Sequence, residues 1–161
     1  MTELIQVNLE WLRQASDLLN RLSTPAFGEI SGHMRHIIEF YECFLDGLPA
    51  GRIDYDARKR DQSIERSTVA ADACIHLLSD CLKTAPELRG DALVWVRLEE
   101  SCATSSVGRE LQVLSSHTVH HFAMIALTLR AHGVMIDRSF GVAPSTLRHR
   151  ASQELVQAEA A

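Results

Sequence analysis

Apolar residues recur every three or four positions along four long stretches of this chain, and this spacing constrains the fold more than any other feature. A helix with that spacing carries an apolar face that must be buried against other helices. The four stretches cover residues 2–23, 29–47, 62–83 and 107–132. A chain of 161 residues suits one domain. The sequence therefore predicts an all-α fold, an antiparallel four-helix bundle over residues 1–150, followed by a frayed C-terminal tail at 151–161.

The stretch between the third and fourth predicted helices breaks the helical pattern. Residues 92–100 read ALVWVRLEE, and the run Val94-Trp95-Val96 favours a strand. We expect a short strand or an extended connection there. Ser106 suits the N-cap of the last helix, because its hydroxyl can accept a hydrogen bond from the first free backbone N–H groups.

Two segments have no role that the sequence assigns. The charged stretch AGRIDYDARKRDQS, residues 50–63, lacks apolar periodicity and is long for a connection within a bundle. It could cover the mouth of a site or be a solvated loop. The second segment is FGVAPSTLR, residues 140–148.

Charge and hydropathy exclude several classes of protein. The formal net charge is −5, and no dense run of Lys and Arg provides the basic face that a nucleic-acid-binding protein usually has. No apolar run approaches the length of about 18 residues that a membrane span needs. The N-terminal residues lack the features of a signal peptide. We therefore expect a cytoplasmic protein that binds neither nucleic acid nor membrane.

Histidine is unusually frequent, and five of the eight histidines fall into two short clusters. His117 and His121 are four residues apart in a predicted helix, so both rings leave the same face. This spacing lets two imidazoles reach one metal ion, as in the HExxH motif. Thr118 stands where that motif has its glutamate, which excludes a protease of that type.

His33 is the candidate third ligand. It lies in the middle of the second predicted helix on an apolar stripe, where a buried ring needs partners for its nitrogens. Three protein ligands with an open fourth position are typical of a catalytic metal. The alternative is that these are hydrogen-bonded core histidines or surface histidines. His36 and His120 are offset around their helices, so we expect them to support the ligands or to lie on the surface.

The segments SGHMRHIIEFY and HTVHHFAMI resemble the corresponding parts of the DinB-like superfamily (DinB/YfiT-like metalloenzymes), and the resemblance covers residues 2–132. It implies a four-helix bundle, often a homodimer, with a three-histidine site for zinc, nickel or iron. Carried over by position, the ligands are His33, His117 and His121. Some members are thiol transferases that act on low-molecular-weight thiols, and others are isomerases.

A metal ion held by three neutral imidazoles keeps its full charge. It can lower the pKa of bound water to about 7 or bind a thiol as thiolate. A hydrolase also needs a general acid or base. Glu110 is the candidate, because it lies seven residues before His117 on the same helix face; alternatively it is a first-turn glutamate favoured by the helix dipole. Tyr41 could line the cavity or belong to the core.

The sequence thus favours a metal-dependent enzyme of the thiol transferase or hydrolase type that acts on a small molecule. A thiol cosubstrate with carboxylates would need basic groups, and Arg35, Arg52 and Arg58 are candidates. One alternative is a metal-binding protein without catalysis. Another is a homodimeric structural or interaction bundle whose histidines are vestigial or merely packed.

Overall fold

The structure is a computed structural model that describes residues 1–159, and this part of the chain is mostly helical. The helices are α1 (Thr2–Leu19), α2 (Thr24–Gly47), α3 (Gln62–Arg66), α4 (Thr68–Thr84), α5 (Val107–Ala131) and α6 (Pro144–Glu159). A 3₁₀ turn, η1 (Leu48–Ala50), follows α2. Three short strands, β1 (Arg52–Asp54), β2 (Leu93–Leu98) and β3 (Ser101–Ser106), complete the described elements.

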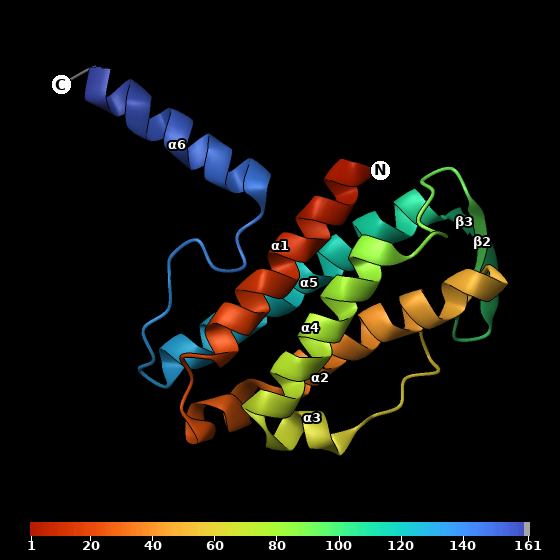
Figure 1. Ribbon diagram of the computed structural model, residues 1–161. Helices are drawn as coiled ribbons and strands as arrows, with labels where there is room; N and C mark the ends of the chain where they lie inside the picture. Colours follow the sequence, from red (N-terminus) through yellow and green to blue (C-terminus); the bar gives the residue numbers. More distant parts are fainter. Residues whose placement is uncertain (160–161) are drawn as a thin grey trace.

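The four predicted apolar stripes meet in one core. Helix α1 packs against α4 and α5, and α2 packs against the same two helices, whereas α6 stands apart from them (Figure 1). Each of these four helices contributes fully buried side chains, for example Leu12, Ile38, Ile75 and Ile125. No helix within residues 1–159 is long and apolar enough to cross a membrane.

The helix ends differ from the predicted ones where a local interaction overrides the apolar period. The third stretch is two helices, because Ser67 has extended backbone angles (φ −147°, ψ 120°) and its hydroxyl accepts a hydrogen bond from the N–H of Ala70. Helix α2 begins at Thr24, since Pro25 is tolerated in a first turn. The prediction for Ser106 is confirmed: its hydroxyl accepts from the N–H of Arg109 and caps α5.

A small sheet lies at one end of the packed helices (Figure 1). The strand expected within residues 92–100 is present as β2, which pairs antiparallel with β3 and parallel with β1. The expectation that the charged stretch before residue 62 is a loop was wrong in part, because β1 falls there, whereas the start of α3 at Gln62 agrees with the predicted third helix. Ile53 and Tyr55 are almost fully buried, with exposed fractions of 1% and 4%. The partner of β1 is distant in sequence, so no local pattern signals this strand.

A buried hydrogen-bond network joins three helices. The hydroxyl of Tyr41 on α2 donates to Oδ1 of Asn8 on α1 at 2.7 Å. The amide of Asn8 donates to the carbonyl of Leu4 at 2.8 Å and to that of Leu111 on α5 at 3.1 Å. Asn8 and Tyr41 are both fully buried. The structure thus places Tyr41 in the core, and its hydrogen bonds are made with Asn8 and Thr118.

We predict that Tyr41→Phe lowers the free energy of unfolding by about 1–2 kcal/mol, because it leaves the buried Oδ1 of Asn8 without its donor. Urea denaturation followed by circular dichroism measures the change. Gln6→Ala on the exposed face of α1 is the control and is expected to stay within about 0.5 kcal/mol of the wild type. Equal stability of Tyr41→Phe and the wild type would show that the network contributes nothing.

Candidate metal centre

The contact between α2 and α5 brings four histidines together. His33 and His36 lie on α2, and His117 and His121 lie on α5. Nε2 of His36 is 3.0 Å from Nε2 of His117, and Nδ1 of His33 is 3.0 Å from Nδ1 of His121. All four side chains are half-buried. The three predicted ligands therefore lie in one cluster, together with His36.

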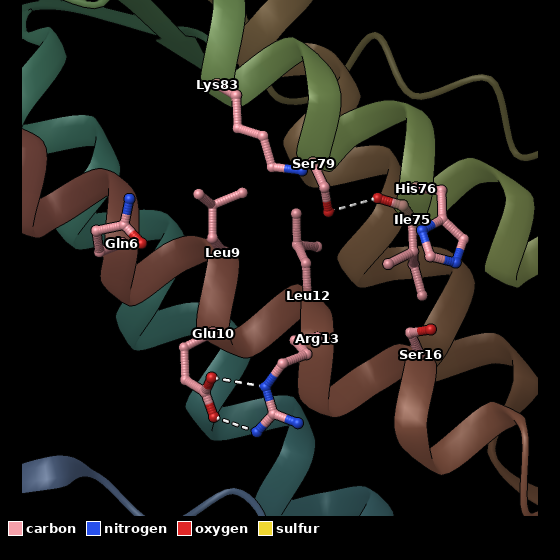
Figure 2. Close-up of a pocket in the computed structure, with 10 residues that line it drawn as sticks. All are labelled: Gln6, Leu9, Glu10, Leu12, Arg13, Ser16, Ile75, His76, Ser79 and Lys83. Atoms are coloured by element: carbon pink, nitrogen blue, oxygen red, sulfur yellow. Dashed lines mark hydrogen bonds and ion pairs between the residues drawn. The ribbon is translucent and has the colours of Figure 1, made fainter.

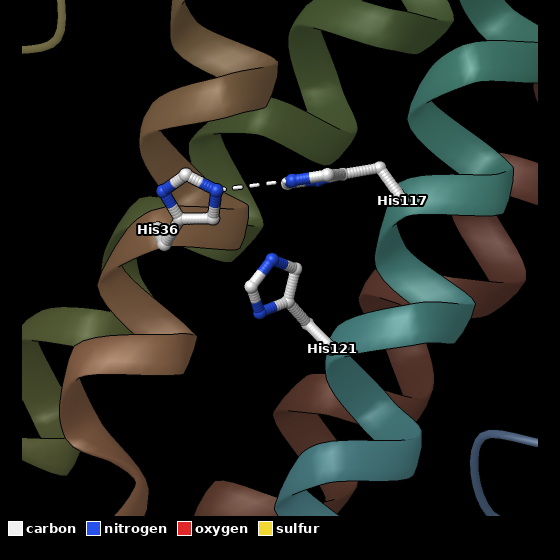
Figure 3. Close-up of side chains that lie close together, drawn as sticks. All are labelled: His36, His117 and His121. Carbon is white, nitrogen blue, oxygen red and sulfur yellow. Dashed lines mark hydrogen bonds between the residues drawn. The ribbon is translucent and has the colours of Figure 1, made fainter.

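Three of the four rings converge on one point. Among the described residues, His36, His117 and His121 form a group whose ligand atoms all lie within 4.8 Å of one another. Figure 3 shows the ring of His121 with one nitrogen, Nε2, directed toward the hydrogen-bonded pair His36 and His117. A tetrahedral ion with metal–nitrogen bonds of about 2.05 Å has ligand atoms about 3.3 Å apart. Ligand atoms at the 4.8 Å limit would therefore have to approach one another by about 1.5 Å to bind such an ion.

His33 and His120 take different places beside this group. Nδ1 of His33 contacts the nitrogen of His121 that faces away from the other two rings (Figure 3). The ring of His120 is exposed and meets that of His121 edge-on, with centroids 5.4 Å apart. The apolar stripe and the resemblance favour His33 as the ligand and place His36 beside it. The two residues are three apart on one helix, and the way α2 crosses α5 brings the ring of His36, not that of His33, to His117.

An aromatic stack forms one wall of the cluster. The ring of Phe40 lies between those of His117 and Tyr55, with centroid distances of 4.0 and 4.2 Å and nearly parallel planes. The hydroxyl of Tyr55 donates to one oxygen of Glu110 at 2.8 Å, and Ser105 donates to the other at 2.5 Å. Glu110, the predicted general base, is thus buried and hydrogen-bonded behind this wall, and these two hydroxyls are its hydrogen-bond partners in the described chain.

The segment formed by residues 55–61 is fixed along α2 by polar contacts. Arg58 donates from its guanidinium to Nδ1 of His36. Lys59 lies 3.4 Å from a carboxylate oxygen of Glu42 and 3.6 Å from one of Asp46. The N–H of Asp61 donates to the buried carboxylate of Glu39 at 2.7 Å. This charged segment therefore lies against the cluster and brings one cation to it.

The environment keeps the three converging imidazoles neutral. Burial, followed by the charge of Arg58, lowers the pKa of His36 to about 4. Burial, followed by repulsion from His36, lowers the pKa of His117 to about 4. Burial, followed by repulsion from His117, lowers the pKa of His121 to about 3. Since the neutral ring is the form that binds a metal ion, all three rings have the charge state that ligation needs at pH 7.

The cluster is open to solvent on one side. A depression of about 450 Å³ is lined by Glu29, Gly32, His33, Arg35, His36 and His121. A second cavity, of about 400 Å³, lies between α1 and α4 (Figure 2). Its polar side chains include the ion pair of Glu10 with Arg13, and the metal-compatible histidine group lies elsewhere. The depression beside the histidines is therefore the better candidate for a reactive site.

Comparison with known proteins gives no family. No protein-family profile and no solved structure matches the chain. A protein described as FK506-binding protein 5, from Rhizopus delemar, is 47% identical over 45 residues. The match covers 28% of this chain and 12% of that protein, so the chain spans a small part of it. A match this short shows neither the family nor the function of this chain.

We predict that the metal-free protein loses stability as the pH falls from about 6.5, the ordinary histidine value that the unfolded chain retains, toward 4. The folded pKa values of His36, His117 and His121 lie below that value, so in this window the unfolded chain binds more protons than the folded one. Melting temperatures in the presence of a chelator measure the loss. The loss of melting temperature should be smaller in His121→Asn than in the wild type. It should be as large as in the wild type in His76→Asn, because the ring of His76 is exposed on α4. A wild-type melting temperature that stays constant from pH 7 to 5 would contradict this.

Proposed function

We propose that this chain is a metal-dependent enzyme that binds one divalent ion, zinc, nickel or iron, through Nε2 of His36, His117 and His121. The convergence of these three nitrogens carries the proposal. The packing of α1, α2, α4 and α5 and the resemblance of the two histidine segments support a DinB-like four-helix bundle around the site. A homodimer is part of the same resemblance. The ligand set differs from the one carried over by position in one member: His36 takes the place of His33.

His33 orients a ligand in this proposal. If Nε2 of His121 binds the ion, Nδ1 of His121 carries the ring proton and donates a hydrogen bond to Nδ1 of His33. Hydrogen bonds of this kind fix the tautomer and the direction of a metal-binding imidazole. His33 would then contribute to affinity without contacting the ion.

The donor set favours transferase chemistry over hydrolysis. Three neutral ligands leave a fourth position open, where a divalent ion supplies Lewis-acid activation of a water or thiol. A hydrolase would also need a base beside that position, but the oxygens of Glu110 accept hydrogen bonds from Tyr55 and Ser105. A thiol ionises far more readily than water, with ordinary pKa values of about 8.5 and 15.7, so a thiol on the ion can lose its proton to solvent without a positioned base. This makes a low-molecular-weight thiol the substrate that fits these residues best.

We predict that the purified wild type binds one equivalent of nickel or zinc and that His36→Ala weakens binding about a hundredfold or more, because a ligand is lost. His33→Ala should weaken it only about tenfold, in the range expected when the partner of a ligand is removed. Competition with a chromophoric chelator measures both affinities. His76→Ala is the control, since this histidine lies exposed on α4.

The relative loss of metal affinity in His36→Ala and His33→Ala distinguishes the ligand set with His36 from the set with His33. If His33→Ala removes binding and His36→Ala does not, the ligands are those that the resemblance implies by position. If the wild type retains no stoichiometric divalent ion, the cluster is a packed group of histidines and the proposal is wrong.

We predict that the metal-loaded protein transfers a small thiol to an electrophile and that His121→Gln reduces kcat/KM by at least about a hundredfold, because the ion that activates the thiol is no longer held. Turnover of a panel of electrophiles with 2-mercaptoethanol measures the rates. His120→Gln is the matched control on the same helix and should retain most activity, because its ring is exposed. Stoichiometric metal without any turnover would favour a binding protein that does not catalyse.

A further inference from the structure

Arg58 makes an unusual contact for a residue beside a metal site. Its guanidinium donates to Nδ1 of His36, and its buried Nε has no hydrogen-bond partner in the described part of the chain. Metal-binding histidines usually donate from their second nitrogen to a carboxylate or a carbonyl oxygen. Here the group at that nitrogen is a cation that can only donate.

Metal binding and this contact exclude each other. When Nε2 of His36 binds an ion, the ring proton moves to Nδ1, and Nδ1 can then no longer accept from Arg58. The guanidinium would lose this hydrogen bond while its Nε is already unpaired. The neighbouring contacts of Lys59 and Asp61 hold the segment 55–61 against α2, so Arg58 would remain beside the cluster.

The carboxylates near the cluster are engaged to different extents. One oxygen of Glu39 accepts from the N–H of Asp61. The other oxygen is buried without a hydrogen bond in the described chain and lies 3.8 Å from the guanidinium of Arg35, so the charge of Glu39 is already opposed by that cation. Glu110 accepts from Tyr55 and Ser105. Glu29, the acidic residue that lines the depression, lies 3.5 Å from His132. A divalent ion with three neutral ligands and a released guanidinium would therefore form a strongly positive site that an anion from solution can neutralise.

We propose that Arg58 binds the carboxylate of a small anionic substrate whose other end reaches the open position of the metal. This rests on the proposed function and specifies its substrate class. The planar fork of a guanidinium matches a carboxylate with two parallel hydrogen bonds. The ion and Arg58 would lie at opposite edges of the His36 ring, so the two ends of the substrate must be several bonds apart. The substrate is then a thiol that carries a carboxylate. The depression lined by His33 and His36 admits its sulfur, and Arg58, which lies outside that depression, is itself half-exposed.

The experiment uses the cobalt-loaded full chain and two thiols that differ at one end. 3-Mercaptopropionate carries a carboxylate, and 2-mercaptoethanol carries a hydroxyl. Thiolate binding changes the visible spectrum of cobalt, and titration at constant ionic strength gives both dissociation constants. We expect the wild type to prefer 3-mercaptopropionate about tenfold, from one charge-assisted contact at a partly exposed site. In Arg58→Gln the preference should fall to about twofold or less, and in Arg58→Lys it should be intermediate, because the charge remains without the fork.

Arg60→Gln is the matched control, since Arg60 is exposed on the same segment, and it should keep the wild-type preference. An unchanged cobalt spectrum in Arg58→Gln before thiol is added shows that the site has folded. If cobalt binds but the wild type takes up neither thiol, or both equally, the role of Arg58 is disproved while the metal site stands. The same conclusion follows if Arg58→Gln keeps the full preference. If cobalt does not bind at all, the proposed function itself fails, and the assignment of Arg58 fails with it.

Discussion

The contact of α2 with α5 is the interaction on which the candidate site depends, because it places four imidazoles against one another away from full solvation. Rings at this distance cannot all be charged, and burial and mutual repulsion lower the pKa values of His36, His117 and His121. Neutral rings each have one donor and one acceptor nitrogen. Since Arg58 donates to Nδ1 of His36, Nε2 of His36 carries the ring proton and donates to His117. Nε2 of His117 thus already has its lone pair available, and His36 is the ring that must exchange tautomers before an ion can bind.

The small sheet supports the wall of this cluster. Strand β1 leads directly to Tyr55, and β3 ends with Ser105 and Ser106 at the start of α5. Tyr55 and Ser105 hold the two oxygens of Glu110, and Tyr55 stacks on Phe40, which stacks on His117. Residues from the sheet and from two helices thereby fix the position of one imidazole. The sheet therefore contributes to the site, although its strands lie at one end of the helices (Figure 1).

Local patterns predicted the helices well and the connections poorly. The apolar period located α1, α2, α4 and α5, and the hydroxyl of Ser106 caps α5 as expected, because both signals depend on residues close in sequence. The tail expected to be frayed from residue 151 is instead part of α6 as far as Glu159. Strand β1 depends on pairing with β2, about 40 residues away, so the stretch 50–63 read as a charged loop. The same limit applies to the site. The spacing of His117 and His121 follows from helix geometry, whereas the contact of His36 with His117 depends on how two helices cross, which no local spacing encodes.

Of the two reaction classes that the sequence left open, the position of Glu110 supports the transferase chemistry that we propose. To act as a base at the open position, its carboxylate would have to leave two hydrogen bonds and the space behind Phe40. That movement would leave the hydroxyls of Tyr55 and Ser105 without their acceptor, at a cost of about 1–3 kcal/mol for each buried group. A thiol substrate would require no such movement, because a thiol is acidic enough to release its proton to solvent once it is bound to the ion, and its sulfur is then the nucleophile. In the proposed function, once Arg58 is released from His36 to hold a carboxylate, the same residues that disfavour hydrolysis would orient an acidic thiol.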